Sequence, residues 1–454
     1  MTARGAAALL LPLLPWLLAA DDGVPARLIG EVLSGQGPYA IVRELCDTVG
    51  PRLAGSPGAA RAEAWALQAL RRAGLVQVRA EPVSVPRWER GPRGGERLQV
   101  LSPYPHELPV AALGGSVGTP AAGVSGELLV LHDLAELEAL PRERVAGRIV
   151  LWNAPMRPGP DGMAPYSTVV PLRTRGAAAA ARKGAVASLI RSLGTSRARL
   201  LHTGSQGSGD DLPPIPAAAV TAEDADLLVR LGQSGPVRLR LHLPCRRLPD
   251  GKGHNIVGEV PGRSRPEEIV LVGAHLDSWD LGQGAVDDGA GVALAIAAAR
   301  AIARQGAART LRVVLFANEE NGLRGAHGYA AMHAAELPRH VAALEVDSGA
   351  GRPLGFLVSS EQARRHLAPL VAPLQALGAA TVQVGRPGGA DLTPIQHQVP
   401  IVQMLQDTSR YFEWHHSPAD TLDKIDPLEL ALAGAALAVA LHGLLDAEQT
   451  LPRP

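Results

Sequence analysis

The sequence lacks an excess of charge of either sign. Lys+Arg and Asp+Glu both number 44, so the formal net charge at pH 7 is zero. Nucleic acids and anionic membranes bind basic surfaces, because cationic side chains neutralise phosphates and displace their counterions. The balanced charge argues against both classes of partner.

Cysteine and asparagine are scarce as well. The two cysteines, Cys46 and Cys245, lie far apart, and either one disulfide or two buried free thiols would be compatible with them. None of the four asparagines begins an Asn-x-Ser/Thr sequence, which excludes N-glycosylation. This absence favours a bacterial periplasm or culture medium over a eukaryotic secretory route.

The first 20 residues have the pattern of a secretory signal peptide. Arg4 provides a positive charge, residues 6–20 are apolar, and the small residues Ala19 and Ala20 precede two aspartates. A retained membrane anchor is the alternative, and the protein is exported in either case. A secreted or periplasmic location is therefore predicted.

A second long apolar run covers residues 428–445. Asp426 and Pro427 before it are typical of the start of a helix, with Asp as N-cap and Pro in the first turn. Glu429, His442 and several small residues suit a helix packed against a sheet better than one in lipid. We expect a core helix and no stable membrane span.

The length of 454 residues predicts more than one domain. Residues 98–248 consist mainly of short β-rich runs between Gly/Pro turns and are interpreted as an inserted domain. Residues 21–97 are expected to be the N-terminal part of a catalytic domain, and residues 249–454 its main part.

The main part alternates between apolar strands and helices. Strands are expected at 268–273, 311–317, 341–346 and 400–405, and helices at 291–304, 325–335 and 361–377. Continuous apolar strands separated by helices are typical of an α/β fold, in which helices cover both faces of a mostly parallel sheet.

Polar clusters follow these strands at the point where each strand ends. In open parallel sheets the carboxyl ends of the strands form the ligand-binding edge, so these side chains can converge. The clusters are His275 with Asp277, Asp287 with Asp288, Glu319 with Glu320, Asp347, and His415 with His416. Taken singly, each is more typical of a turn, a cap or a solvated surface pair.

Together, two imidazoles and at least four carboxylates would be costly in an apolar chain without a cation. Histidine and carboxylate ligands without cysteine are typical of catalytic zinc. Two zinc ions per chain fit this number of ligands, and a water that bridges such a pair becomes a nucleophile at neutral pH. One carboxylate of the Glu319-Glu320 pair must stay free of metal to accept the proton of that water.

The order and spacing of these residues resemble the co-catalytic zinc aminopeptidase family. The segments that carry the resemblance are 273–289 (GAHLDSWDLGQGAVDDG), His415-His416-Ser417 with Asp420-Thr421, and 49–57 (VGPRLAGSP). Residues 145–152, 184–187 and 215–217 of the inserted region resemble the protease-associated domain of this family. The resemblance covers nearly all of the chain after the signal peptide.

This resemblance implies a zinc exopeptidase-like fold and a role for each residue. The metal ligands would be His275 and Asp347 for one zinc, Glu320 and His416 for the other, and Asp287 as the bridge. Asp277 would hold the imidazole of His275 in its metal-binding tautomer, and Glu319 would be the general base. A cis peptide bond between Asp287 and Asp288 and a homodimer are also implied.

The last ligand and the substrate pocket leave alternatives open. Related aminopeptidases often place an oxyanion-stabilising tyrosine where this chain has His415, which can donate a similar hydrogen bond. His416 is preferred to His415 as the ligand from its spacing to Asp420-Thr421. Gly388–Asp391 and Asp407–Tyr411 are candidates for the pocket, and Arg386 and Arg410 for contact with a substrate carboxylate.

The sequence thus predicts an exported zinc metallopeptidase that hydrolyses dipeptides or short peptides. A glutaminyl-cyclase-like acyltransferase and a non-catalytic receptor-like protein on the same scaffold are the alternatives. A binding module with an incidental metal is a further alternative, and the presence of Glu319 argues against it. The preferred peptide end and side chain stay open.

Overall fold

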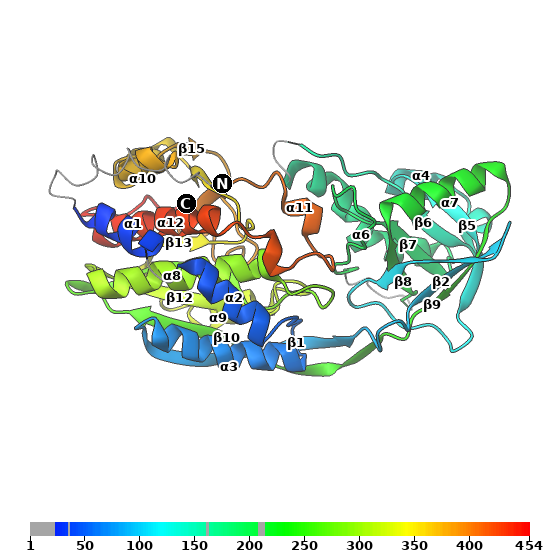
Figure 1. The fold of residues 1–454 in the computed structure, drawn as a ribbon, viewed down its shortest axis with the longest axis horizontal. Coiled ribbons are helices and arrows are strands. Elements are labelled where there is room, and N and C mark those ends of the chain that lie inside the picture. Colours follow the sequence, from blue (N-terminus) through cyan, green and yellow to red (C-terminus); the bar gives the residue numbers. More distant parts are fainter. Residues whose placement is uncertain (1–22, 35–36, 160–162, 208–213) are drawn as a thin grey trace, which may run out of the picture.

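The computed structural model describes residues 23–34, 37–159, 163–207 and 214–454. The predicted signal peptide lies outside these residues. The described chain contains two eight-stranded sheets, each with its own helices, which lie side by side along the long axis of the molecule (Figure 1).

The first sheet has the strand order β1-β10-β12-β11-β13-β16-β14-β15. Its four central strands, β12, β11, β13 and β16, pair in parallel, whereas β10 joins β12 and β14 joins β16 in antiparallel fashion. The sheet is therefore mixed, where the sequence predicts a mostly parallel one. The strands are β1 Val76–Glu89, β10 Arg246–Val260, β11 Arg265–His275, β12 Arg309–Phe316, β13 His340–Glu345, β14 Pro353–Val358, β15 Val382–Val384 and β16 Ile401–Gln406.

Helices cover both faces of this sheet, as the sequence predicts. Along β11, Val270 and Val272 face the core that contains α8 and α12, and Leu271 between them faces a separate core with Tyr329 of α9. This alternation is expected for a strand whose successive side chains point to opposite faces. The helices of this unit are α1 Val24–Ser34, α2 Pro38–Thr48, α3 Pro57–Arg72, α8 Ala290–Gln305, α9 Arg324–Met332, α10 Glu361–Val371, α11 Tyr411–Trp414 and α12 Pro427–Asp446.

Helix α12 is long and apolar enough to cross a membrane, but 72% of its most apolar window is buried. It packs against α8 and α1. The side chain of Asp426 accepts hydrogen bonds from the main-chain N–H groups of Leu428 and Glu429, at 2.8 and 3.1 Å, as expected of an N-cap. These contacts agree with the prediction of a core helix.

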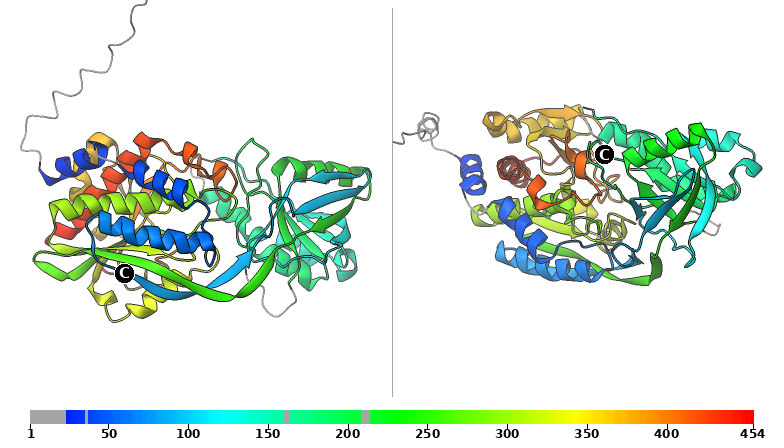
Figure 2. Two further views of the ribbon diagram at one scale, coloured as in Figure 1. Left: turned by 60° about the horizontal axis from the view of Figure 1, so that its bottom comes forward. Right: turned by 45° about the vertical axis from the view of Figure 1, so that its right-hand side comes forward.

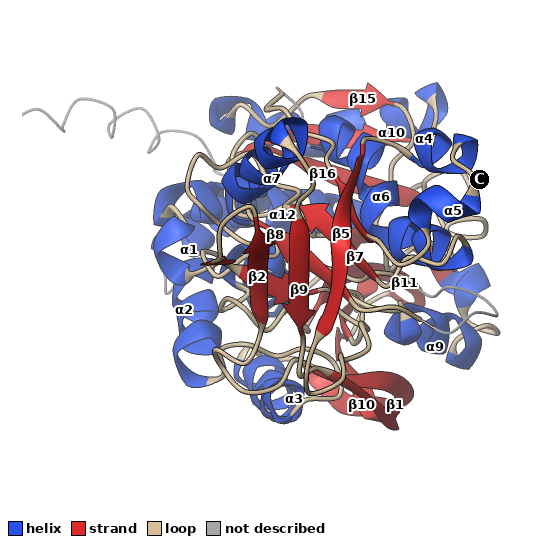
Figure 3. Ribbon diagram, turned by 90° about the vertical axis from the view of Figure 1, so that its right-hand side faces the viewer, coloured by secondary structure: helices blue, strands red, loops and turns tan. Residues whose placement is uncertain are grey.

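The second sheet has the order β3-β2-β9-β5-β6-β7-β8-β4 and is seen from its own side in Figure 3, where β2, β9 and β5 run side by side. Helices α4 to α7 pack on it. Its elements are β2 Arg97–Ser102, β3 His106–Leu108, β4 Val110–Ala112, β5 Val124–Leu131, α4 Leu134–Ala139, α5 Arg142–Val145, β6 Ile149–Trp152, α6 Met163–Arg182, β7 Ala187–Arg191, β8 Ala217–Val220, α7 Ala222–Ser234 and β9 Arg238–His242.

Two long strands connect the two units. β1 leaves the first sheet and β10 returns to it, and they pair as an antiparallel ribbon from Val76↔Glu259 to Glu89↔Arg246 (Figures 1 and 2). β10 pairs antiparallel with both β1 and β12, and β14 pairs antiparallel with β16, so the sheet is mixed at both sides of its parallel centre. β10 is not predicted from the sequence.

Two helices end before their predicted bounds. The helix expected over 325–335 ends at Met332. The helix expected over 361–377 ends at Val371 and continues as a 3-10 turn over Ala372–Leu377. Pro373 lies at the start of that turn, and because proline has no N–H to donate it interrupts the α-helical hydrogen bonds.

The second unit also contacts the loop that follows β11. Arg90 donates to both carboxylate oxygens of Asp280, at 2.7 and 2.8 Å, and to the carbonyl of Ala112 at 2.7 Å. Next to it, the buried ring of Trp279 packs on Gly114, where a Cβ would lie 1.9 Å from a ring carbon of the tryptophan. The contact therefore requires glycine at position 114.

We predict that Gly114→Ala destabilises the protein by about 1–3 kcal/mol, because Trp279 must move within a packed interface. Chemical denaturation followed by tryptophan fluorescence measures the change. Gly232→Ala is the control, since a Cβ there meets no atom within 4 Å. An equal effect of both substitutions would contradict the packing argument.

Candidate metal centre

The predicted polar residues meet at one edge of the first sheet. His275 is the last residue of β11, Asp347 follows β13 after one residue, and Glu319-Glu320 follow β12 after two. His416 is the second residue after the short helix α11 that follows β16. These strands are neighbours and parallel, so their carboxyl ends bring the side chains together, as the sequence predicts.

Asp287 lies between the two histidines. Its Oδ1 is 3.1 Å from Nε2 of His275, and its Oδ2 is 3.3 Å from Nε2 of His416. The other carboxylates divide between the same two nitrogens: Asp347 Oδ1 lies 3.8 Å from His275 Nε2, and Glu320 Oε2 lies 3.0 Å from His416 Nε2. The five residues form two groups that share Asp287.

The donor atoms fit a metal centre. Oδ2 of Asp287, Oε1 of Glu320 and Oδ1 of Asp347 are buried and have no hydrogen-bond partner within the described chain. Three sets of these side chains bring ligand atoms within 4.8 Å of one another, and the sets also include Asp288 and His415. Buried carboxylate oxygens without a donor are costly unless a cation takes the donor's place.

The other acidic groups at this edge are held by main-chain amides. Asp288 accepts from the N–H groups of His275 and Gly291, both at 3.1 Å, and the peptide bond between Asp287 and Asp288 is cis, as the resemblance implies. Asp420 accepts from the N–H groups of Val286 and Asp287, at 2.7 and 3.2 Å. No structural role of Asp288 or Asp420 is predicted from the sequence.

Asp277 contacts His275 in a different way from the one expected. Its main-chain carbonyl oxygen lies 3.0 Å from Nδ1 of His275, whereas its carboxylate is 3.9 Å from that nitrogen. The carboxylate instead accepts from the N–H of Glu319 at 3.0 Å. The carbonyl leaves Nε2 of His275 directed toward Asp287, and the carboxylate holds the turn that carries Glu319 and Glu320.

Burial and mutual repulsion shift the protonation of these groups. Burial, with the charges of Asp347 and Glu320, raises the pKa of Glu319 well above its ordinary value. Burial would also raise the pKa of Asp287, but the neighbouring imidazoles of His275 and His416 hold it well below its ordinary value. Burial alone would lower the pKa of His416, and the carboxylates of Glu320 and Asp287 raise it to about 9.

The second unit contributes directly to this centre. The guanidinium of Arg173, in α6, donates to the carbonyls of Thr203 and Ser205, at 3.3 and 3.2 Å. The same Thr203 carbonyl lies 3.4 Å from Nδ1 of His416, so it can accept from that nitrogen and leave Nε2 for a metal. Gly204 lies against Arg173, where a Cβ would be 2.4 Å from the guanidinium carbon.

His415 is enclosed by groups from both units. Its ring stacks on His416 with centroids 3.5 Å apart, and the ring of Tyr166, in α6, meets it edge-on at 5.2 Å. Its main-chain carbonyl lies 2.7 Å from Nδ1 of His202. Its own Nε2 is 3.6 Å from Asp287 Oδ2, slightly farther than that of His416, and Glu320 contacts His416.

Arg52 fixes the loop between His275 and Asp287. Its side chain is fully buried and donates to the carbonyls of Leu276, Gln283 and Gly284, at 2.6, 2.7 and 2.8 Å. Arg52 belongs to segment 49–57, one of the segments that carry the family resemblance. Its role in the loop could not be predicted from the sequence, because an isolated arginine gives no sign of the carbonyls it will meet.

Comparison with known proteins identifies the family. The model of peptidase family M28 matches residues 255–441, the part that carries every candidate metal ligand. Human carboxypeptidase Q is 38% identical over 420 residues, which cover 91% of this chain and 86% of the human protein. The chain belongs to peptidase family M28.

Solved structures of the M28 family agree with this assignment. A peptidase M28 precursor from Shewanella amazonensis SB2B is 40% identical, with a TM-score of 0.91, and covers 95% of this chain and 98% of its own. A zinc aminopeptidase from Bacillus subtilis shares the fold, with a TM-score of 0.67 at 20% identity and coverage of 91% and 95%. The predictions of the family and of a zinc metallopeptidase are confirmed.

The candidate pocket residues are only partly near the centre. Asp391 is buried, neither of its carboxylate oxygens has a hydrogen-bond partner among the described residues, and burial raises its pKa well above the ordinary value. Arg410 lies over the ring of Trp414 and next to Glu413, and it lines a small pocket together with Trp414. Arg386 is exposed.

Cys46 and Cys245 are buried free thiols and form no disulfide.

We predict that zinc binding to the metal-free protein releases protons. Since the pKa of His416 is raised to about 9, its imidazole is protonated below that pH in the metal-free protein and the metal must displace the proton. The zinc affinity should therefore fall as the pH decreases below about 9. Titration calorimetry in buffers of different ionisation enthalpy measures the protons released, and a binding heat independent of the buffer would contradict the prediction.

We also predict that Arg173→Met weakens zinc binding by about 10–100-fold at the site that contains His416, because the Thr203 carbonyl loses the donor that fixes it. Competition with a chromophoric chelator measures the affinity. Arg148→Met is the matched control, because it removes an arginine of the same unit that pairs with Glu127. Unchanged affinity in Arg173→Met would show that this arginine does not position His416.

Proposed function

We propose that this M28 peptidase is a dinuclear zinc exopeptidase that hydrolyses dipeptides or short peptides. The observation that carries the proposal is the position of Asp287, whose two oxygens face Nε2 of His275 and Nε2 of His416 at 3.1 and 3.3 Å. A single carboxylate between two buried imidazoles is suited to bridge two cations. The relatives named carboxypeptidase Q support action at a chain end.

In this proposal each zinc has its own pair of ligands besides the bridge. His275 and Asp347 would hold one ion, and Glu320 and His416 the other. Asp287, Glu320 and Asp347 each have a buried oxygen without a hydrogen-bond partner among the described residues, which supports this division. When bound, the zinc pair would lower the pKa of a water molecule to near neutrality and polarise the scissile carbonyl.

Glu319 is the residue best suited to move the proton. Its main chain is held by the hydrogen bond from its N–H to the Asp277 carboxylate, at 3.0 Å. Burial next to Asp347 and Glu320 raises its pKa well above the ordinary value, which favours a carboxylate that takes up a proton. We infer that it accepts the proton of the attacking water and donates it to the leaving amine.

His415 is proposed to stabilise the oxyanion. Burial lowers the pKa of its imidazole well below the ordinary value, with His416 adding to the effect, so the ring is neutral. A neutral imidazole can donate one hydrogen bond to an oxygen that becomes negative in the transition state. The stacking with His416 and Tyr166 would hold the ring in place.

Three further assignments belong to the proposal. The unit with the second sheet is proposed to be the protease-associated domain implied by the resemblance, and its strands run from Arg97 to His242. The protein is proposed to be exported by residues 1–20. The homodimer implied by the resemblance stays a prediction.

We predict that Glu319→Gln lowers kcat by about 10²–10⁴-fold, because the proton of the water then has no acceptor. Zinc content per chain should be unchanged, since Glu319 holds no metal in the proposal. The exposed Glu267→Gln serves as the control. Hydrolysis of a dipeptide panel and metal analysis give the two readouts, and full activity of Glu319→Gln would refute the general-base assignment.

The same panel separates the two reactions considered for this scaffold. A peptide with N-terminal glutamine would be cleaved by an exopeptidase and cyclised by a glutaminyl-cyclase-like acyltransferase. Mass spectrometry distinguishes the products, because cyclisation releases ammonia and leaves the peptide bonds intact.

A further inference from the structure

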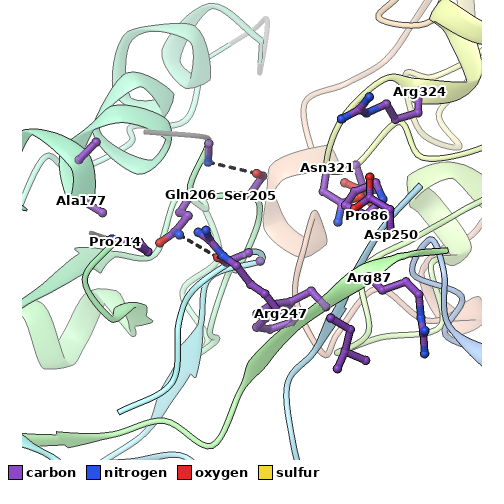
Figure 4. A pocket seen from close by; sticks show the side chains of 18 of the residues that line it. Pro86, Arg87, Ala177, Ser205, Gln206, Pro214, Arg247, Asp250, Asn321 and Arg324 are labelled. Atoms are coloured by element: carbon purple, nitrogen blue, oxygen red, sulfur yellow. Dashed lines mark hydrogen bonds between the residues drawn. The ribbon is translucent and has the colours of Figure 1, made fainter. Parts of the chain in front are cut away.

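A cleft of about 830 Å³ lies between the two units and reaches the metal centre at Glu320. This volume is within the range of about 300–1,000 Å³ that is usual for ligand sites. One wall is formed by residues 320–322 and the start of α9, and the opposite wall by α6 and residues 205–207. β1 and β10 cross between the walls (Figure 4).

The lining of the cleft is positively charged although the whole chain is neutral. It contains the arginines Arg87, Arg247 and Arg324, against two carboxylates, Glu320 and Asp250. Glu320 is committed to a metal in the proposed function, which leaves Asp250 alone against three guanidinium groups. The cleft therefore favours an anionic group of a ligand.

Arg247 is fixed in the cleft without a counter-charge. Its Nε donates to the carbonyl of Gly115 at 2.5 Å, and Gln206 donates to the same carbonyl at 2.9 Å. In the part of the chain that the structure describes, no carboxylate lies within 4.0 Å of its guanidinium. Partial burial lowers the pKa of Arg247, as expected of a cation that lacks an anionic partner.

Arg324 approaches the cleft from the other wall. It begins α9, four residues after Glu320, and its exposed side chain likewise has no carboxylate within 4.0 Å among the described residues. In Figure 4 the guanidinium groups of Arg324 and Arg247 come from opposite sides of the cleft. The buried Oε1 of Gln206, which has no partner in the described chain, is an additional acceptor on the cleft wall.

We propose that Arg247 and Arg324 form a subsite that binds a carboxylate of the peptide substrate. The proposal rests on the proposed peptidase function and specifies which substrates the site selects. Guanidinium groups form charge-assisted hydrogen bonds with carboxylates, and Arg247 and Arg324 present two of them to the same cleft. The carboxylate is either the C-terminus of a short peptide or an acidic side chain.

Two matched pairs of substrates distinguish the sources of the carboxylate. Ala-Ala against Ala-Ala-amide changes only the C-terminal charge, and Ala-Glu-amide against Ala-Gln-amide changes only the side-chain charge. For the wild-type protein we expect kcat/KM to favour one charged member. Arg247→Gln and Arg324→Gln should each lower that preference by about ten- to a hundredfold, since a hydrogen bond to a charged group is lost.

The neutral substrate of each pair is the internal control. Its kcat/KM should change little in either variant if the fold and the metal centre are intact. Arg365→Gln is the matched control variant, because Arg365 is an exposed arginine of α10 that does not line the cleft and should leave the preference as in the wild type. Loss of the C-terminal preference or of the side-chain preference supports the subsite and identifies its source. A preference that persists in both cleft variants, or that falls equally in Arg365→Gln, overturns it.

A binding measurement separates failure of the subsite from failure of the proposed function. In the zinc-loaded Glu319→Gln background, Ala-Glu and Ala-Gln-amide can be titrated by calorimetry without turnover. Adding Arg247→Gln and Arg324→Gln should weaken binding of the charged peptide by at least about tenfold and leave that of the neutral peptide nearly unchanged. Equal binding of both peptides with and without the two arginines contradicts the subsite, even if the wild-type enzyme hydrolyses neither peptide.

Discussion

Several buried carboxylates lie close together at the edge of the first sheet, and the structure must compensate their charge. The rest of the site depends on this requirement. Asp288 and Asp420, which support the centre, accept hydrogen bonds from main-chain N–H groups. Asp287, Glu320 and Asp347, which face its interior, each contain a buried oxygen without a donor among the described residues. Buried carboxylates of this kind are costly unless a proton or a cation neutralises them. Because these three carboxylates lie beside the imidazoles of His275 and His416, the arrangement fits a metal centre.

Residues of the second unit contact the two histidines His415 and His416 of this centre directly. Arg173 donates to the Thr203 carbonyl, which lies beside Nδ1 of His416. His202 contacts the main-chain carbonyl of His415. Trp279, in the loop after β11, packs on Gly114. The cleft lined by Arg247 and Arg324 lies at the same interface between the two units. The same interface thus contacts the last histidines and lines the cleft with arginines.

The convergence of His275, Glu320 and Asp347 could be predicted because each lies at, or within four residues after, the end of an apolar strand, and the ends of parallel strands meet at one edge of a sheet. The sequence also indicated α12, whose cap at Asp426 has a clear local pattern. It missed β10, because residues 246–255 are largely polar and carry Pro249 and two glycines, which masks a strand that crosses between the units. The roles of Arg52, Arg173 and Arg247 could not be predicted, because each donates to main-chain carbonyls distant in the sequence. Every residue has a carbonyl, so the sequence does not indicate which one an arginine will contact. Arg386 and Arg410, suggested for a substrate carboxylate from their position in the sequence, do not line this cleft.

The most direct test is an anomalous-scattering map at the zinc absorption edge, from crystals of the zinc-loaded protein. The account predicts two peaks about 3.5–4 Å apart, one beside His275 and Asp347, the other beside Glu320 and His416, with Asp287 in contact with both. A single peak, or two peaks of which Asp287 contacts one or none, would contradict a dinuclear centre.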